Sequence, residues 1–319
     1  MIEATGLTKH YGRTVAVDNL SFGVGEGRVT GFLGPNGAGK STTMRMILGL
    51  DRPTSGDVRI DGEHYRDLKR PLTTVGALLD AKWVHPNRSA RAHLRWLAAA
   101  SKLPYSRVDE VLDIVGLTAV ANKRAGGFSL GMSQRLGIAG ALLGDPRVLL
   151  FDEPVNGLDP EGILWIRRFM HRLAAEGRTV FVSSHLLSEM AQTAQDLVVI
   201  GRGKLIYQGT VDDFIANATE NTVVVRSPEL DRLTELLRAD GVSLVADGDA
   251  IRVSGVDSAA IGELAAANKI VLHELNPQIG SLEEAFIQLT GDTVEYTAHT
   301  DQHTAPAEPA GATEEAPPA

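Results

Sequence analysis

Two hydrophobic patterns alternate along residues 1–218. Short apolar runs rich in Val, Leu and Phe end at glycines or polar residues and predict buried strands at 28–33, 148–151 and 179–182. Between such runs, apolar side chains recur every three or four positions, which predicts amphipathic helices. We therefore expect an α/β fold with buried parallel strands over this part of the chain.

A second, compact pattern fills residues 222–290. Strands are predicted at 222–226, 242–246, 250–254 and 270–275, and helices at 228–240, 258–268 and 281–290. The order β-α-β-β-α-β followed by one helix is that of a small α+β, ferredoxin-like domain.

The chain therefore divides into three predicted parts. Residues 1–218 form the larger α/β domain and 219–292 an accessory domain. Residues 293–319 form a tail rich in Ala, Pro, Thr and Glu, with five acidic residues and no Lys or Arg. We expect the tail to be disordered, because it lacks the apolar side chains that would build a core.

Composition narrows the function classes. The formal net charge of −9 argues against a protein whose main function is to bind nucleic acid, so no nucleic-acid partner is expected. Cys is absent, which excludes disulfides and Cys-based metal sites. We find no apolar run long enough to span a bilayer and no secretory signal at the start, so a place inside the cell is expected.

A phosphate-binding loop follows the strand predicted at 28–33. The pattern G-x-x-x-x-G-K-S/T, with a strand before it and a helical pattern after it, is formed by Gly34, Pro35, Asn36, Gly37, Ala38, Gly39, Lys40, Ser41 and Thr42. Its glycines let backbone N–H groups turn toward phosphate oxygens, and the helix start adds its positive dipole end. Lys40 is expected to reach the β- and γ-phosphates, and Ser41 to ligate Mg²⁺.

Two carboxylates end the apolar run at 148–151. The carboxyl ends of parallel strands are where α/β sheets bind ligands, so Asp152 and Glu153 are expected near the phosphates. We predict that Asp152 holds Mg²⁺ and that Glu153 orients and deprotonates the attacking water.

Further motifs appear in a fixed order. Phe128-Ser129-Leu130-Gly131-Met132 stands before Asp152, Asn156-Gly157-Leu158-Asp159 after it, and Ser183-Ser184-His185 ends the strand predicted at 179–182. With the phosphate loop, this set resembles the ATP-binding cassette (ABC) ATPases over roughly residues 3–218.

The resemblance implies an ABC-type P-loop core that binds ATP and Mg²⁺, with an antiparallel β arm (roughly 3–30 and 57–75) and a helical arm (roughly 82–145). It also implies roles for single residues. Tyr11 would stack on adenine and His185 would contact the γ-phosphate. Ser129 and Gly131 would face the γ-phosphate bound by a second subunit, and Asp159 would couple the two sites.

Two departures from the family pattern are present. The usual signature Leu-Ser-Gly-Gly-Gln reads Phe128-Ser129-Leu130-Gly131-Met132, and Asp80 stands where the family's Q-loop has Gln. Together with the accessory domain, these departures resemble the ATPase subunits of bacterial drug, peptide-antibiotic or polysaccharide exporters, and most of all the bacitracin- and daunorubicin-resistance type. A carboxylate such as that of Asp80 can approach Mg²⁺ or water but cannot donate a hydrogen bond.

The implied function is an ATP hydrolase that energises a separate transmembrane permease from the cytoplasmic face of the membrane. The implied ATPase assembly is a homodimer, or a pair with a paralogous ATPase. The alternative is a soluble ABC ATPase acting on ribosomes or nucleic acid. That alternative fits less well, because the chain has a single cassette and only a short interval between Ser41 and Ser129.

Overall fold

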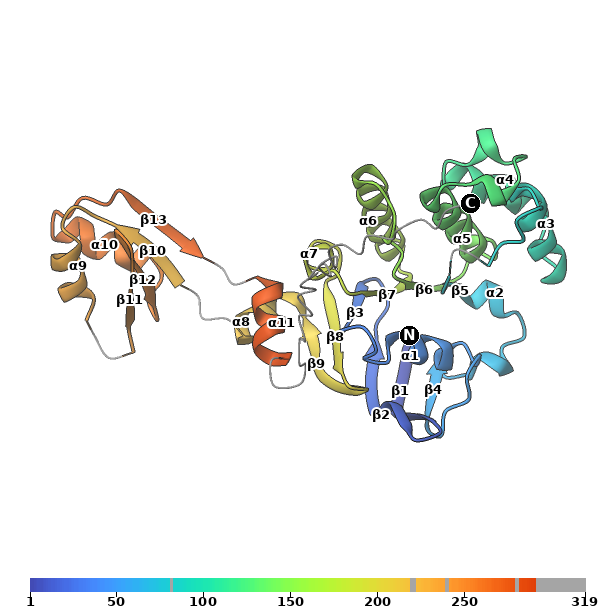
Figure 1. Cartoon of the computed structure of the whole chain (residues 1–319), viewed down its shortest axis with the longest axis horizontal. Coiled ribbons are helices and arrows are strands. Elements are labelled where there is room, and N and C mark those ends of the chain that lie inside the picture. Colours follow the sequence, from blue (N-terminus) through green and yellow to red (C-terminus); the bar gives the residue numbers. More distant parts are fainter. Residues whose placement is uncertain (81–82, 219–221, 239–240, 279–280, 291–319) are drawn as a thin grey trace, which may run out of the picture.

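The computed structural model describes residues 1–80, 83–218, 222–238, 241–278 and 281–290 (Figure 1). The predicted disordered tail, 293–319, lies outside the described residues. Within the described part, no helix is both long and apolar enough to cross a membrane.

A six-stranded sheet forms the centre of the larger unit. Its strands lie in the order β5-β6-β7-β3-β8-β9, and all neighbours are parallel except β8 and β9. The strands are β3 (Val29–Leu33), β5 (Val75–Leu78), β6 (Val148–Asp152), β7 (Thr179–Ser184), β8 (Asp196–Gly201) and β9 (Lys204–Thr210). Because both faces of this sheet are covered, β3 and β7 are buried at every position, as their continuous apolar runs predict.

A three-stranded antiparallel arm covers one side of the central sheet. Its order is β2-β1-β4, from β1 (Ile2–Tyr11), β2 (Thr14–Val24) and β4 (Ser55–Ile60). Three stacked rings, Phe22 of the arm with Phe32 and Phe181 of the central sheet, join the two sheets at centroid distances of 5.0 to 5.7 Å. The arm is thereby fixed beside the phosphate loop.

The arm is smaller than the predicted 3–30 and 57–75. Residues from Val29 onward belong to the central sheet, and the arm's last strand ends at Ile60. Beyond it the chain turns and forms α2 (Pro71–Thr74), where Pro71 occupies a favoured position in the first turn of a helix.

Helices make up the rest of the larger unit (Figure 1). They are α1 (Lys40–Ile47), α3 (Ala90–Ala100), α4 (Ser106–Ile114), α5 (Leu130–Leu142), α6 (Pro160–Ala175), α7 (Leu187–Ala191) and α8 (Val211–Ala218). Among them α3, α4 and α5 form the predicted helical arm, and they pack into one hydrophobic cluster with the sheet.

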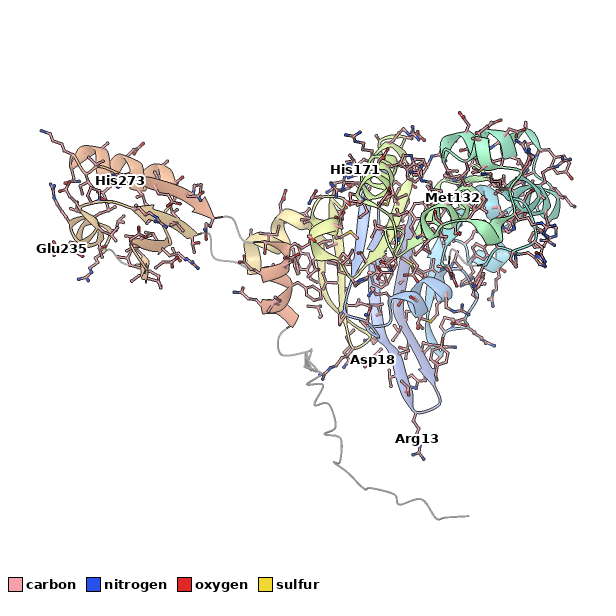
Figure 2. The ribbon with its side chains drawn as sticks, turned by 45° about the horizontal axis from the view of Figure 1, so that its top comes forward. Arg13, Asp18, Met132, His171, Glu235 and His273 are labelled. Atoms are coloured by element: carbon pink, nitrogen blue, oxygen red, sulfur yellow. The ribbon has the colours of Figure 1, made fainter. Side chains whose placement is uncertain are left out.

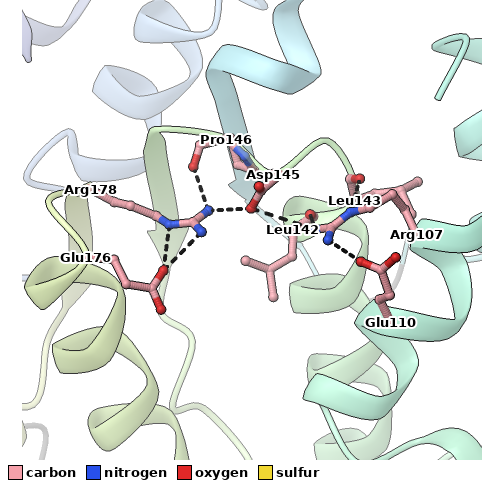
Figure 3. Close-up of polar contacts among 8 residues, drawn as sticks. All are labelled: Arg107, Glu110, Leu142, Leu143, Asp145, Pro146, Glu176 and Arg178. Carbon is pink, nitrogen blue, oxygen red and sulfur yellow. Dashed lines mark hydrogen bonds and ion pairs between the residues drawn. The ribbon is translucent and has the colours of Figure 1, made fainter. Parts of the chain in front are cut away.

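Two arginines hold the segment that joins the helical arm to the central sheet (Figure 3). Arg107 of α4 donates to the carbonyl oxygen of Leu142 at 3.2 Å, so it satisfies a backbone acceptor at the end of α5. Arg178, just before β7, donates to Oδ1 of Asp145 at 2.9 Å. These bonds hold the turn between α5 and β6, and therefore the start of the strand that ends at Asp152.

The accessory unit has the predicted order of elements. It consists of β10 (Thr222–Arg226), α9 (Leu230–Leu237), β11 (Ser243–Asp247), β12 (Ala250–Ser254), α10 (Ser258–Ala267) and β13 (Glu274–Gln278). The antiparallel sheet has the order β11-β12-β10-β13 and packs its own core against α9 and α10. In Figure 2, Glu235 and His273 mark this unit, while Asp18, Met132 and His171 mark the larger one.

The last strand of the accessory unit lies four residues later than predicted. The apolar residues at 270–275 suggested a strand, but Ile270 instead fills the small core and pairing with β10 begins at Glu274. Because β13 is an edge strand, Pro277 is tolerated there despite lacking an N–H donor.

The final helix, α11 (Leu282–Thr290), does not pack with the accessory unit to which the sequence assigned it. Leu282, Ala285 and Phe286 are buried in the hydrophobic cluster of the larger unit, where α11 contacts α7 and α8. The chain thus leaves the larger unit after α8, forms the accessory unit and returns (Figure 1). The apolar spacing i, i+3, i+4 predicted the helix but could not show which core it joins.

Candidate active site

The predicted motifs meet at one edge of the central sheet. The phosphate loop follows β3, Asp152 ends β6, His185 follows β7 and Asp80 follows β5. Since these strands are parallel neighbours, their carboxyl ends lie side by side. Segments more than 100 residues apart in the sequence are thereby brought to a single site.

The phosphate loop has the backbone shape that its glycines predict. Gly37 and Gly39 have φ of +81° and +103°, in the left-handed region that favours glycine. A Cβ on Gly39 would also lie 2.5 Å from the carbonyl oxygen of Ala16, so a side chain is excluded there. The loop leads directly into α1, whose first residue is Lys40.

Lys40 is enclosed by the loop that precedes it. Its side chain is 7% exposed, and Nζ donates to the carbonyl oxygen of Gly34 at 2.6 Å. Burial lowers the pKa of the Lys40 ammonium, and the carboxylates of Glu153 and Asp152 oppose that shift. Partial desolvation of the Lys40 ammonium strengthens its attraction for a phosphate, whereas the two neighbouring carboxylates oppose that attraction.

Glu153 lies between Lys40 and His185. Its Oε1 is 3.8 Å from Nζ of Lys40, and its Oε2 is 2.8 Å from Nδ1 of His185. The three residues that the sequence predicted as catalytic are thus in mutual contact through the Glu153 carboxylate. This geometry suits a base that must accept a proton next to the phosphates.

Two buried side chains around the carboxylates were not predicted as site residues. Ser183 of β7 bonds to the Asp152 carboxylate and to the backbone N–H of Glu153, and Gln134 of α5 bonds to the carbonyl oxygen of Glu153. A polar residue at the end of an otherwise apolar run, as at Ser183, was the available signal. The strand register that pairs it with Asp152 could not be seen in the sequence.

The donor set at this edge fits Mg²⁺ only in the presence of a nucleotide. No cluster of three or more acidic or His side chains in the described part of the chain is placed to hold a metal. Ser41 and Asp152 offer two oxygen ligands, and Mg²⁺ in nucleotide sites is typically held by one or two protein oxygens, phosphate oxygens and water. These two oxygens are of the donor type that Mg²⁺ takes in such sites.

Tyr11 lies at the end of β1, within reach of α1 and the turn that follows it. Its hydroxyl donates to Oδ2 of Asp51 at 2.8 Å, and Arg45 donates to the same oxygen at 2.8 Å. The hydrogen bond to Asp51 raises the pKa of the Tyr11 hydroxyl. The side chain stays about half exposed, and Nζ of Lys9 lies over one face of its ring at 4.9 Å from the centroid, so a base could stack only on the opposite face.

The predicted signature and the loop after Glu153 form a second group. Ser129 is the N-cap of α5, and its hydroxyl accepts the N–H of Met132 at 3.2 Å. A Cβ on Gly131 would lie 3.3 Å from the side chain of Leu158. Asp159 is the N-cap of α6, and its carboxylate accepts the N–H of Gly162 at 2.9 Å.

Ser129 and Gly131 lie at the start of α5, at some distance in the sequence from the phosphate loop. Their contacts described above are with α5 itself and with Leu158. Asp80 is exposed two residues beyond the end of β5.

Comparisons with known proteins agree with this geometry. The family model described as "ABC transporter" matches residues 17–156, and a model described as a domain of unknown function matches 221–283. The bacitracin transport ATP-binding protein BcrA of Bacillus licheniformis is 38% identical, covering 91% of this chain and 97% of its own. The lantibiotic transport ATP-binding protein SrtF of Streptococcus pyogenes is 35% identical, covering 66% and 92%.

A solved structure shows the same fold in a dimer. It is the post-hydrolysis state of the ATP-binding cassette MJ0796 with ADP and Pi, which is 26% identical at a TM-score of 0.60, covering 66% of this chain and 99% of that one. The match to BcrA extends over nearly the full length of both chains. The chain belongs to the ATP-binding, ATP-hydrolysing subunits of ABC transporters.

Proposed function

We propose that the chain energises a separate transmembrane permease that exports an antibiotic or a similar amphipathic compound. ATP hydrolysis is supported by the contacts that the Glu153 carboxylate makes with Lys40 and His185 beside the phosphate loop. The exporter class is supported by the relatives named for bacitracin and lantibiotic transport. Attachment to the cytoplasmic face of the membrane follows from binding that permease.

The residues of one chain have distinct tasks in this proposal. Backbone N–H groups of the phosphate loop and the Lys40 ammonium bind the β- and γ-phosphates. The Glu153 carboxylate orients a water and takes its proton. His185, which holds that carboxylate through Nδ1, contacts the γ-phosphate. Tyr11 stacks on adenine.

Ser41 and Asp152 are proposed to hold Mg²⁺, which neutralises the charge that develops on the phosphate oxygens. Asp80 is proposed as a coupling residue toward the permease and not as a main catalytic group, because Asp lacks the donor that Gln supplies. Residues 1–218 form the nucleotide-binding domain and 219–292 the accessory domain, anchored to the former by α11.

A second subunit completes each site. Ser129 and Gly131 start a helix whose N–H groups are a second anion-binding feature, although the chain has one phosphate loop to serve. We assign this second feature to the phosphates of a partner copy, with Asp159 at the contact between the two sites.

Replacing Glu153 with Gln tests the catalytic assignment. A positioned base is typically worth about 10²–10⁴-fold, so hydrolysis should fall by that factor while ATP still binds. Steady-state ATPase rates and equilibrium ATP binding check the two halves, and nucleotide-loaded dimers should accumulate in size-exclusion chromatography. Wild-type turnover in Glu153→Gln would end the assignment.

A further inference from the structure

The proposed general base has a backbone conformation that side-chain-bearing residues rarely adopt. Glu153 has φ of +49°, in the left-handed region. This conformation costs an L-residue on the order of 1–2 kcal/mol and persists only where surrounding groups hold it. The carboxylate of Glu153 therefore depends on whatever fixes the peptide units on either side.

Two buried side chains from distant elements hold those peptide units. The hydroxyl of Ser183, which is fully buried, accepts the N–H of Glu153 at 3.0 Å. On the other side, Nε2 of Gln134 donates to the carbonyl oxygen of Glu153 at 3.3 Å, and Gln134 is 5% exposed. Neither side chain has a role in the chemistry proposed so far.

Ser183 also reaches the predicted metal ligand. Its O–H donates to Oδ1 of Asp152, so one hydroxyl bonds to both carboxylate-bearing residues. Strand register makes this possible, because Ser183 is the direct partner of Asp152 in the parallel pair β6–β7. A buried hydroxyl has one donor and two acceptor lone pairs, and these bonds use the donor and one lone pair.

We propose that Ser183 is a positioning residue for ATP hydrolysis, which fixes the Asp152 carboxylate and the Glu153 backbone relative to each other. This inference rests on the proposed roles of Asp152 and Glu153. Gln134 supports the same peptide from α5. Without the Ser183 hydroxyl, the Glu153 N–H loses its partner and the Asp152 carboxylate is free to turn.

If Ser183 only filled space and satisfied buried polar groups, the expected effects of removing its hydroxyl would differ from those of a positioning role. Removing the hydroxyl would then lower the stability of the fold without changing how the folded protein binds metal or turns over ATP. A positioning role predicts that kcat and the preference for Mg²⁺ change in folded protein. The two readings are therefore separable by measurement.

The experiment compares Ser183→Ala, Ser183→Thr and Ser183→Val in the full chain. Thr and Val have the same shape and differ by the hydroxyl. Each variant is assayed for kcat, for KM of ATP, and for nucleotide affinity with Mg²⁺ and with EDTA, after thermal unfolding has shown that it is folded. The affinity ratio between Mg²⁺ and EDTA is a readout independent of turnover.

Ser183→Val and Ser183→Ala should lower kcat by about 10–100-fold, the usual cost of losing a group that orients a metal ligand. The ratio of affinities with Mg²⁺ and EDTA should fall, while affinity in EDTA stays unchanged. Ser183→Thr should stay within several-fold of wild type. If kcat of Ser183→Thr is as low as that of Ser183→Val, the added methyl causes the loss in both. Ser183→Ala, which adds no methyl, then tests the role of the hydroxyl.

Wild-type kcat and Mg²⁺ preference in folded Ser183→Ala overturn the proposal. A combination with Glu153→Gln separates it from the catalytic assignment. If Ser183 acts through Glu153, adding Ser183→Ala to Glu153→Gln causes little further loss of kcat. A full additional loss of kcat refutes action through Glu153 and leaves action through Asp152, which the affinity ratio between Mg²⁺ and EDTA tests. Wild-type turnover of Glu153→Gln alone refutes the catalytic assignment.

Discussion

Single residues of the site differ in how far the sequence could predict them. Lys40, Asp152 and Glu153 stand at fixed places in motifs whose chemistry dictates the residue type, so their positions could be read directly. Ser183 and Gln134 bond to the Glu153 backbone through strand register and helix packing. Such partners lie 19 to 30 residues away in the sequence, and a local pattern can mark a polar residue such as Ser183 but cannot show which group it bonds to.

Tyr11 gives a prediction at this scale. Asp51 holds its hydroxyl and leaves the ring half exposed. Stacking of a base on an aromatic ring is worth about 1–3 kcal/mol, so Tyr11→Ala should weaken ATP binding by roughly 5- to 150-fold. Tyr11→Trp, which keeps an aromatic face, should bind ATP nearly as well as wild type. Equilibrium titration with a fluorescent ATP analogue measures both.

Inorganic tripolyphosphate is the control ligand for this prediction, because it has phosphates and no base. Its affinity should be the same in Tyr11→Ala and wild type. An equal loss of affinity for tripolyphosphate and ATP would show that the substitution disturbs the phosphate loop and that stacking is not the cause.

At the scale of elements, hydrophobic periodicity predicted most strands and helices, and the misses have physical reasons. The strand expected at 270–275 lies at Glu274–Gln278, because Ile270 is used to fill the small core. The helix at the end of the described chain was predicted, but its packing partner was not. An apolar stripe shows that a helix is buried on one face and leaves the identity of the covering surface open.

Neighbouring residues of α11 allow a matched test of its docking. Phe286 is buried against the larger unit, whereas Ile287 is 63% exposed. Truncating a buried Phe typically costs about 3–5 kcal/mol, so Phe286→Ala should release α11 from α7 and α8. Amide hydrogen exchange should then speed up in α11 and in the adjoining helices.

Ile287→Ala serves as the control, because it removes an aliphatic side chain of the same helix from a solvent-exposed position. It should leave hydrogen exchange in α7 and α8 as in wild type. If Phe286→Ala also exchanges at the wild-type rate in α7, α8 and α11, then α11 contributes nothing to the larger unit in solution.

At the scale of the molecule, the arrangement of two anion-binding features implies cooperation between two chains. The phosphate loop lies at one sheet edge, and the helix start at Ser129 packs toward Leu158, in the loop that follows Glu153. A cap at Ser129 alone would contribute about 1 kcal/mol to stability whatever the function. A composite site instead makes Gly131 necessary for hydrolysis at the phosphate loop of the other chain.

Mixing two inactive variants distinguishes these possibilities. In a dimer of Lys40→Ala with Gly131→Asp, one site carries both lesions and the other carries neither. If one intact site turns over by itself, an equal mixture should recover about a quarter of the wild-type ATPase rate, since half of the dimers are mixed and each has one intact site of two. Each variant alone, at the same total concentration, is the control and should be inactive. Normal hydrolysis by Gly131→Asp held monomeric by dilution would show that Gly131 acts only within its own helix, because a monomer has no second chain to supply a signature to its phosphate loop.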